Sequence, residues 1–155
     1  MSLTFALDEV EAIGAELARV LRPGDAIGLR GDLGAGKSTL ARAILAALGL
    51  QGEAHSPSFA IVQPYAPPEL RLPLLHVDLY RIEDPEEMDE LGLDETRDDH
   101  VLLIEWPERM GRRQWPDMLM LGIEFDGPDA RRLTASLPPA WEARWPFLQG
   151  FHRPR

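Results

Sequence analysis

Apolar residues in the first third of the chain recur at helical spacing on both sides of a glycine-rich turn. In residues 8–21 they lie three or four positions apart, which predicts a helix with Asp8 as its N-cap. Residues 25–31 predict a short strand. Residues 39–50, rich in Ala and Leu, predict a second helix that ends at Gly49. The order is therefore helix, strand, glycine loop, helix.

The remaining two thirds predict mainly strands. Residues 100–106 form an apolar run without alternation, which is typical of a strand buried on both faces of a sheet. Residues 117–127 and 130–137 flank a turn and predict a hairpin. The other expected elements are a loop at 50–60, strands at 60–65 and 70–80, a short helix at 85–91, and at most one short helix in the tail 138–155.

Composition narrows the class of protein. A chain of 155 residues predicts a single domain, and the absence of cysteine excludes disulfides, thiolate metal sites and cysteine catalysis. A formal charge of −10 argues against strong direct binding of nucleic acid, because phosphate binding needs a basic face. No apolar run is long enough to span a membrane and the start does not resemble a signal peptide, so we expect a cytoplasmic protein.

The charge is unevenly distributed. Residues 83–99 hold ten acids and one Arg, which leaves 16 acids against 15 bases in the rest of the chain. The acidity is thus a local patch, whose simplest interpretation is a solvated segment and whose alternative is a docking face for a basic partner. Among the 16 basic residues there is one lysine, Lys37, and it lies in the glycine-rich turn.

The segment Gly31-Asp32-Leu33-Gly34-Ala35-Gly36-Lys37-Ser38 fits the phosphate-loop pattern G-x-x-x-x-G-K-[ST]. Glycines let successive backbone N–H groups point at phosphate oxygens, and the following helix presents its N-terminus to the anion. The lysine reaches the β- and γ-phosphates, and the serine hydroxyl can bind Mg²⁺. A chance match is the alternative, but a chain with so little lysine makes it improbable.

A phosphate loop needs a carboxylate near Mg²⁺ or the attacking water, usually where a neighbouring strand ends. Asp78 and Glu105 each close a predicted strand. Ligands bind at the carboxyl ends of strands in open α/β sheets, so both are candidates, and an ordinary exposed acid at a strand–loop junction is the alternative for each.

Four further positions have a functional and a structural interpretation. Ser58, in the loop 55–59, has a hydroxyl able to sense the γ-phosphate or merely to cap a connection. Trp106 either stacks on a ligand or covers the core. For His76 a structural role is favoured, and for Arg81 a surface ion pair is favoured over a contact with the γ-phosphate.

The segments GDLGAGKST, SPSF, HVDLYR and LIEWPE, in this order and at these spacings, resemble the TsaE family (formerly YjeE). These are small bacterial P-loop ATPases required for threonylcarbamoyladenosine modification of tRNA. The resemblance covers roughly residues 3–137. Many families share the phosphate loop, whereas HVDLYR and IEWPE together with it are specific. Ser38 and Ser58 replace the commoner Thr, which keeps each hydroxyl and loses a methyl.

The resemblance implies a P-loop NTPase-like α/β domain over 1–137, with a mixed parallel and antiparallel sheet flanked by helices. The tail 138–155 lies outside the pattern. The resemblance also implies ATP and Mg²⁺ as cofactors. It further implies docking on the TsaD–TsaB transferase, so that the link to tRNA is indirect. The modified base is the adenosine 3′ of the anticodon. ATP hydrolysis is expected to be slow alone and stimulated by partners.

Individual roles carry over by position. The resemblance implies catalytic roles for Lys37, Asp78 and Glu105, with Ser38 and Glu105 at the metal. The implied nucleotide-binding residues are Asp32, Gly34, Ala35, Gly36, Lys37, Ser38, Thr39, Ser58 and Trp106. The alternatives are a small-molecule P-loop kinase, for which no dedicated lid is visible, and an interaction module that nucleotide binding switches without hydrolysis.

Overall fold

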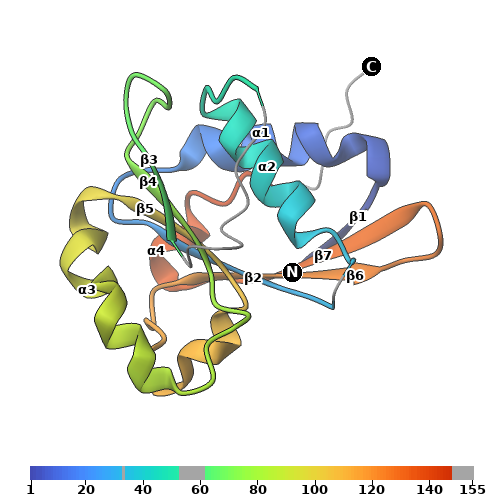
Figure 1. The fold of residues 1–155 in the computed structure, drawn as a ribbon. Coiled ribbons are helices and arrows are strands. Elements are labelled where there is room, and N and C mark those ends of the chain that lie inside the picture. Colours follow the sequence, from blue (N-terminus) through green and yellow to red (C-terminus); the bar gives the residue numbers. More distant parts are fainter. Residues whose placement is uncertain (33, 53–61, 148–155) are drawn as a thin grey trace.

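A seven-stranded mixed sheet forms the centre of the computed structural model, which describes residues 1–32, 34–52 and 62–147 (Figure 1). The strands are β1 (Ser2–Ala6), β2 (Ala26–Arg30), β3 (Val62–Tyr65), β4 (Leu74–Asp78), β5 (Val101–Glu105), β6 (Leu119–Phe125) and β7 (Ala130–Ser136). Their order across the sheet is β1-β7-β6-β2-β5-β4-β3. The central four are parallel and the outer ones antiparallel, which confirms the expected mixed α/β architecture.

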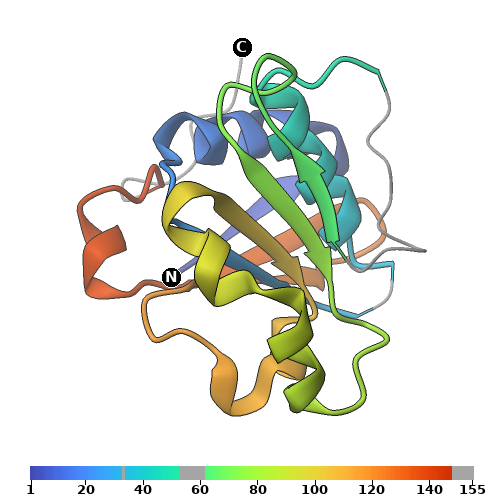
Figure 2. The ribbon, with the colours of Figure 1, turned by 60° about the vertical axis from the view of Figure 1, so that its left-hand side comes forward.

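Helices cover both faces of this sheet (Figures 1 and 2). The long helices α1 (Val10–Val20) and α2 (Lys37–Ala47) pack on one face. The other face is covered by shorter helices that belong to a second apolar cluster. These shorter elements are η2 (Pro85–Leu91), α3 (Leu93–Thr96) and η4 (Pro107–Arg113), while η1 (Leu7–Glu9), η3 (Arg97–Asp99) and α4 (Pro139–Glu142) lie outside that cluster.

The strand β5 shows why its sequence does not alternate. All five of its residues are buried. Val101 and Leu103 point into the cluster beneath α1 and α2, whereas Leu102 and Ile104 point into the cluster on the opposite face. A central strand with apolar layers on both sides needs apolar residues at every position, as the run at 100–106 predicts.

Several element boundaries differ from the sequence-based expectations. The first helix begins as η1 and continues as α1, and Asp8 is not its cap: the Glu9 carboxylate accepts from the Ala6 N–H at 2.8 Å instead. The strand expected over 70–80 forms at Leu74–Asp78, after Pro73. Strand β1 was not predicted, because it is an edge strand whose pairing partner, β7, lies at the far end of the sequence.

Other expectations are confirmed. β6 and β7 form the predicted antiparallel hairpin, and η2 is the short helix with Pro85 in its first turn. Pro64 lies in β3, an edge strand of the sheet, where proline is tolerated.

The C-terminal segment holds one short helix, α4. Trp141, Trp145 and Phe147 are buried in the same cluster as α1 and α2, so this part of the tail packs on the core. The division of the chain at residue 137 stays a prediction. Within the described ranges, no helix combines the length and apolar character needed to cross a bilayer.

Candidate functional site

The glycine-rich loop connects the end of β2 to the start of α2, which is the context that a phosphate loop requires. Gly34 and Gly36 have φ angles of +81° and +118°, a region that residues with a Cβ rarely adopt. Helix α2 begins at Lys37, so its unpaired N–H groups face the loop. The backbone is therefore arranged as an anion-binding turn at a helix N-terminus.

Two predicted acids lie beside this loop. Strands β2, β5 and β4 are adjacent and parallel, so their carboxyl ends share one edge of the sheet. Asp78 and Glu105 are register partners at the last positions of β4 and β5. The Ser38 hydroxyl donates to Glu105 Oε1 at 2.8 Å. The structure thus brings Ser38 and both acids together, as the sequence predicts for residues that serve one site.

His76 holds the other oxygen of the Glu105 carboxylate. Its Nε2 lies 2.7 Å from Glu105 Oε2, and both side chains are buried. Burial by itself raises the pKa of Glu105, but the His76 and Ser38 hydrogen bonds and the nearby positive charges outweigh it and lower the pKa below its usual value. From sequence, a structural role is favoured for His76, and its buried contact with Glu105 is compatible with that role; the identity of its partner is seen only in the structure.

Lys37 is almost fully buried against an aromatic ring. Its Nζ donates to the Gly31 carbonyl and lies 3.6 Å from the centroid of the Trp106 ring. Burial lowers the pKa of Lys37, opposed by Glu105 and other acids. Trp106 has a φ of +61°, unusual for a residue with a side chain, and this turn after β5 directs the ring toward the lysine.

Asp78 has few internal contacts. Its Oδ1 accepts from the Tyr80 N–H at 3.0 Å, and its carboxylate forms no ion pair within the described part of the chain. Burial raises the pKa of Asp78 above its usual value of 3.8, although the Tyr80 hydrogen bond works against the shift. Tyr80 in turn packs against Trp106 with ring centroids 5.1 Å apart.

These groups surround one open cavity of about 250 Å³ at the edge of the sheet. Its lining consists of Gly34, Gly36, Lys37, Ser38, Thr39, Asp78, Tyr80, Glu105 and Trp106. Tyr80 was not a predicted site residue, although it belongs to the HVDLYR segment and follows Asp78 by two positions. A larger hollow of about 560 Å³ runs along α1 and α2 and shares Thr39, but its described lining contains no glycine-rich backbone and no pair of acids.

The other predicted residues have simpler surroundings. Asp32 is exposed and its carbonyl accepts from the Ala35 N–H, which closes a turn of the loop. Thr39 is exposed, and its hydroxyl accepts from Arg42 at 3.3 Å. Arg81 is exposed, and neither Glu83 nor Asp84 pairs with it among the described residues. Ser58 lies outside the described residues.

The donor set at this edge fits magnesium held jointly with a nucleotide. The Ser38 hydroxyl and the Glu105 carboxylate supply hard oxygen ligands 2.8 Å apart. The described residues contain no cluster of three or more His, Cys, Asp or Glu side chains able to hold a metal by themselves. Mg²⁺ commonly takes one or two protein oxygens and completes its shell with phosphate oxygens and water. Ser38 and Glu105 can supply the protein oxygens of such a shell.

Comparison with known proteins agrees with this geometry. The family model for "Threonylcarbamoyl adenosine biosynthesis protein TsaE" matches residues 5–133. A tRNA threonylcarbamoyladenosine biosynthesis protein TsaE from Bacillus subtilis is 38% identical over 128 residues, 82% of this chain and 78% of that protein. The protein of the same name from Streptomyces coelicolor is 40% identical over 113 residues, covering 72% and 76% of the two chains.

A solved structure agrees as well. The crystal structure of Bacillus subtilis YdiB superposes with a TM-score of 0.75 and 30% identity, covering 92% of this chain and 90% of the other. A family model that matches most of the chain, relatives of this identity and a shared fold lead to one conclusion: the chain belongs to the TsaE family.

Proposed function

We propose that this protein is a Mg²⁺-dependent P-loop ATPase that supports threonylcarbamoyladenosine modification of tRNA. The observation that carries the enzymatic part is the convergence of Lys37, Ser38, Asp78 and Glu105 on one cavity at the helix N-terminus. The relatives named as tRNA threonylcarbamoyladenosine biosynthesis proteins support the pathway. Because tRNA is modified in the cytoplasm, we expect the protein to act there.

Each side chain has a role that follows from its surroundings. The backbone N–H groups of residues 34–38 and the Lys37 ammonium bind the phosphates, because the loop concentrates positive partial charge there. Bound Mg²⁺ would neutralise the β- and γ-phosphate charge, held by Ser38 with Glu105 directly or through water. His76 fixes the orientation of the Glu105 carboxylate.

Asp78 is suited to position the attacking water and to accept its proton. One of its oxygens is held by the Tyr80 N–H, and its carboxylate lines the cavity. The burial that raises the pKa of Asp78 makes it a stronger base than an exposed aspartate. Trp106 covers Lys37 and forms the wall next to Tyr80.

Turnover of ATP tests the enzymatic role. Asp78→Ala and Glu105→Ala should each lower ATP hydrolysis by about a hundredfold or more, measured as phosphate release with TsaD and TsaB present. Glu16→Ala, which removes a surface acid paired with Arg19 on α1, outside both the cavity and the segment 83–99, serves as the control and should keep the wild-type rate. Unchanged rates in both site variants would refute the role assignment. ADP release that depends on an added small acceptor would favour a kinase instead.

Reconstituted threonylcarbamoylation of tRNA by TsaD and TsaB tests the biological role. We expect this protein to support repeated turnover by docking on the TsaD–TsaB complex, with tRNA bound by that complex. Omitting the protein should then reduce the product per transferase well below that of the complete reaction. Full support by wild-type protein with a non-hydrolysable ATP analogue would favour a switch driven by binding alone.

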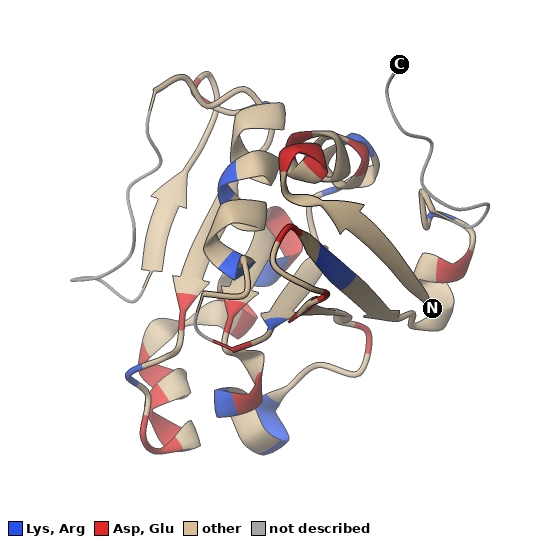
Figure 3. Ribbon diagram, turned by 90° about the vertical axis from the view of Figure 1, so that its right-hand side faces the viewer, with Lys and Arg blue, Asp and Glu red and all other residues tan. Residues whose placement is uncertain are grey.

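The acidic segment 83–99 is a candidate docking face for that complex. It follows β4 and carries its acids on short exposed helices (Figure 3). Replacing four exposed acids, Glu83, Glu86, Glu87 and Glu90, with Gln should weaken binding to TsaD–TsaB and flatten its salt dependence, while ATP affinity stays unchanged. Wild-type affinity and salt dependence in that variant would assign docking to another face.

A further inference from the structure

An exposed aromatic ring lies on the side of the phosphate loop opposite to the acids. Phe125, the last residue of β6, is 54% exposed, more than any other large apolar side chain in the described part of the molecule. β6 is parallel to β2 and is its neighbour, with Arg30 at the end of β2 opposite Gly122. Phe125 therefore lies beyond the end of β2, and Figure 1 shows the β6–β7 hairpin extending past that point.

Specific contacts hold this hairpin against the loop. A Cβ built on Gly34 would lie 4.0 Å from the Phe125 ring, and one on Gly36 would lie 3.9 Å from the Ile123 side chain. Arg131, at the start of β7, donates from Nε to the Ala35 carbonyl at 3.0 Å. Its guanidinium carbon lies 4.4 Å from the centre of the Phe125 ring. The ring and the guanidinium thus form one surface fixed to the backbone of the phosphate loop.

The order of the strands gives a nucleotide on this loop a direction. β5 and β4 lie on one side of β2 and carry Glu105 and Asp78, while β6 lies on the other side. The terminal phosphate belongs on the side with the metal and water ligands, so the α-phosphate, ribose and base extend toward β6. On that side, the hairpin places the exposed Phe125 ring beside Gly34.

We propose that Phe125, backed by Arg131, is the platform on which the base of the bound nucleotide stacks. The inference rests on the proposed nucleotide binding and adds the position of the base. A phenyl ring offers a π-face to any base, and the guanidinium adds a cation–π contact. Phe125 supplies no hydrogen bond to a base edge, so the platform contributes affinity without selecting adenine over guanine.

The test compares Mg·ATP with Mg·tripolyphosphate, which has the phosphates but no nucleoside. In isothermal titration calorimetry, Phe125→Ala should weaken ATP binding by about fivefold or more, the loss expected for one stacked base, and leave tripolyphosphate affinity unchanged. Phe125→Trp should retain the wild-type ATP affinity, because it keeps an aromatic face. Wild-type unfolding midpoints would show that the variants fold, as expected at an exposed position.

Arg131 and Arg132 provide a matched pair for the second half of the proposal. They are adjacent on β7, and removing either changes the net charge equally, but Arg132 lies 3.8 Å from Asp126 rather than on Phe125. Arg131→Ala should weaken ATP binding more than Arg132→Ala. Equal losses for the two would mean that only net charge matters and would overturn the role of Arg131.

Other outcomes separate this inference from the proposed function. Wild-type ATP affinity in Phe125→Ala, or equal loss of ATP and tripolyphosphate, would overturn the platform while leaving the phosphate loop as the nucleotide site. If Phe125→Ala instead weakened only assembly with TsaD–TsaB, Phe125 would belong to a protein interface and the platform would be wrong. A wild-type protein that bound neither probe would overturn the proposed function and this inference with it.

Discussion

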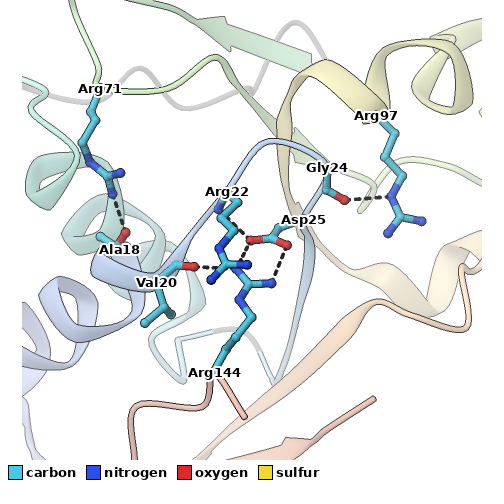
Figure 4. A network of polar contacts seen from close by, with 8 residues as sticks. All are labelled: Ala18, Val20, Arg22, Gly24, Asp25, Arg71, Arg97 and Arg144. Atoms are coloured by element: carbon cyan, nitrogen blue, oxygen red, sulfur yellow. Dashed lines mark hydrogen bonds and ion pairs between the residues drawn. The ribbon is translucent and has the colours of Figure 1, made fainter. Parts of the chain in front are cut away.

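The charged side chains at the two ends of strand β2 differ in their surroundings: those before the strand pair with one another, whereas those beyond it line a cavity. Just before the strand, Asp25 accepts from Arg144 Nη1 at 2.9 Å, from Arg144 Nη2 at 2.6 Å and from the Arg22 N–H at 2.7 Å (Figure 4). Beyond the other end, Lys37 and Asp78 line an open cavity, and Asp78 accepts one hydrogen bond from the backbone and forms no ion pair among the described residues. At one end the carboxylate is held by three hydrogen bonds, and at the other Asp78 retains capacity for a ligand.

Further arginine contacts surround the connection before β2, which we call the closed end; the cavity beyond the strand is the open end. Arg144 also donates to the Val20 carbonyl and stacks at 4.1 Å from the Trp141 ring, while Arg97 donates to the Gly24 carbonyl at 3.3 Å (Figure 4). These bonds tie the connection between α1 and β2 to α4 and η3. A carboxylate whose lone pairs are filled by fixed donors contributes to stability, whereas one with unused lone pairs in a cavity is available for chemistry.

The largest expected effect comes from breaking the closed end. Asp25→Ala leaves the Arg144 guanidinium without its carboxylate partner at a mostly buried position, which should lower the free energy of unfolding by about 3 kcal/mol, measured by urea denaturation. Asp89→Ala is the control, because it breaks an Arg–Asp pair in which both side chains are more exposed, 36% for Arg113 and 64% for Asp89, and little or no loss is expected there. Equal losses would mean that burial of the Asp25 pair adds nothing.

The next effect concerns Glu105, the satisfied acid of the open end. Glu105→Gln removes the charge that His76 and Ser38 stabilise and should lower the free energy of unfolding by about 2 kcal/mol at neutral pH. The folded-state pKa of Glu105 is lowered, so its contribution is complete above the unfolded value of 4.5 and is lost as the pH falls through the folded pKa. The difference from wild type should therefore shrink in acid. The exposed Glu124, replaced by Gln, should show almost no difference at either pH.

The smallest effect has the opposite sign. Asp78 has a raised folded-state pKa, so its ionised form costs stability above that pKa, and the cost vanishes below the unfolded value of 3.8. Asp78→Asn keeps an oxygen for the Tyr80 N–H and should raise the free energy of unfolding by about 0.5 kcal/mol at pH 7, converging with wild type in acid, while ATP hydrolysis is lost. If Asp78→Asn instead lowered the free energy of unfolding, the ionised Asp78 carboxylate would stabilise the fold, as those of Asp25 and Glu105 do.

Local patterns predicted the parts of this molecule that depend on neighbouring residues in the chain. The glycine loop, helix α2 and the β6–β7 hairpin follow from short segments whose spacing and turn residues specify their shape. The buried character of β5 follows from its unbroken apolar run. Pairing across long stretches of chain has no such local signal, which is why β1 was missed and why the extent of β4 was overestimated.

The same distinction applies to the candidate site. Lys37 and Ser38 are marked by their motif, and Asp78 and Glu105 by their positions after apolar runs. The sequence by itself therefore determined which residue types stand ready to bind phosphate and metal. Only the tertiary structure decided that His76 holds Glu105, that Arg144 closes the opposite end of β2, and that Phe125 lies beside Gly34. These contacts join residues 29 to 119 positions apart, and the order of strands in the sheet, rather than any local pattern, brings them within reach.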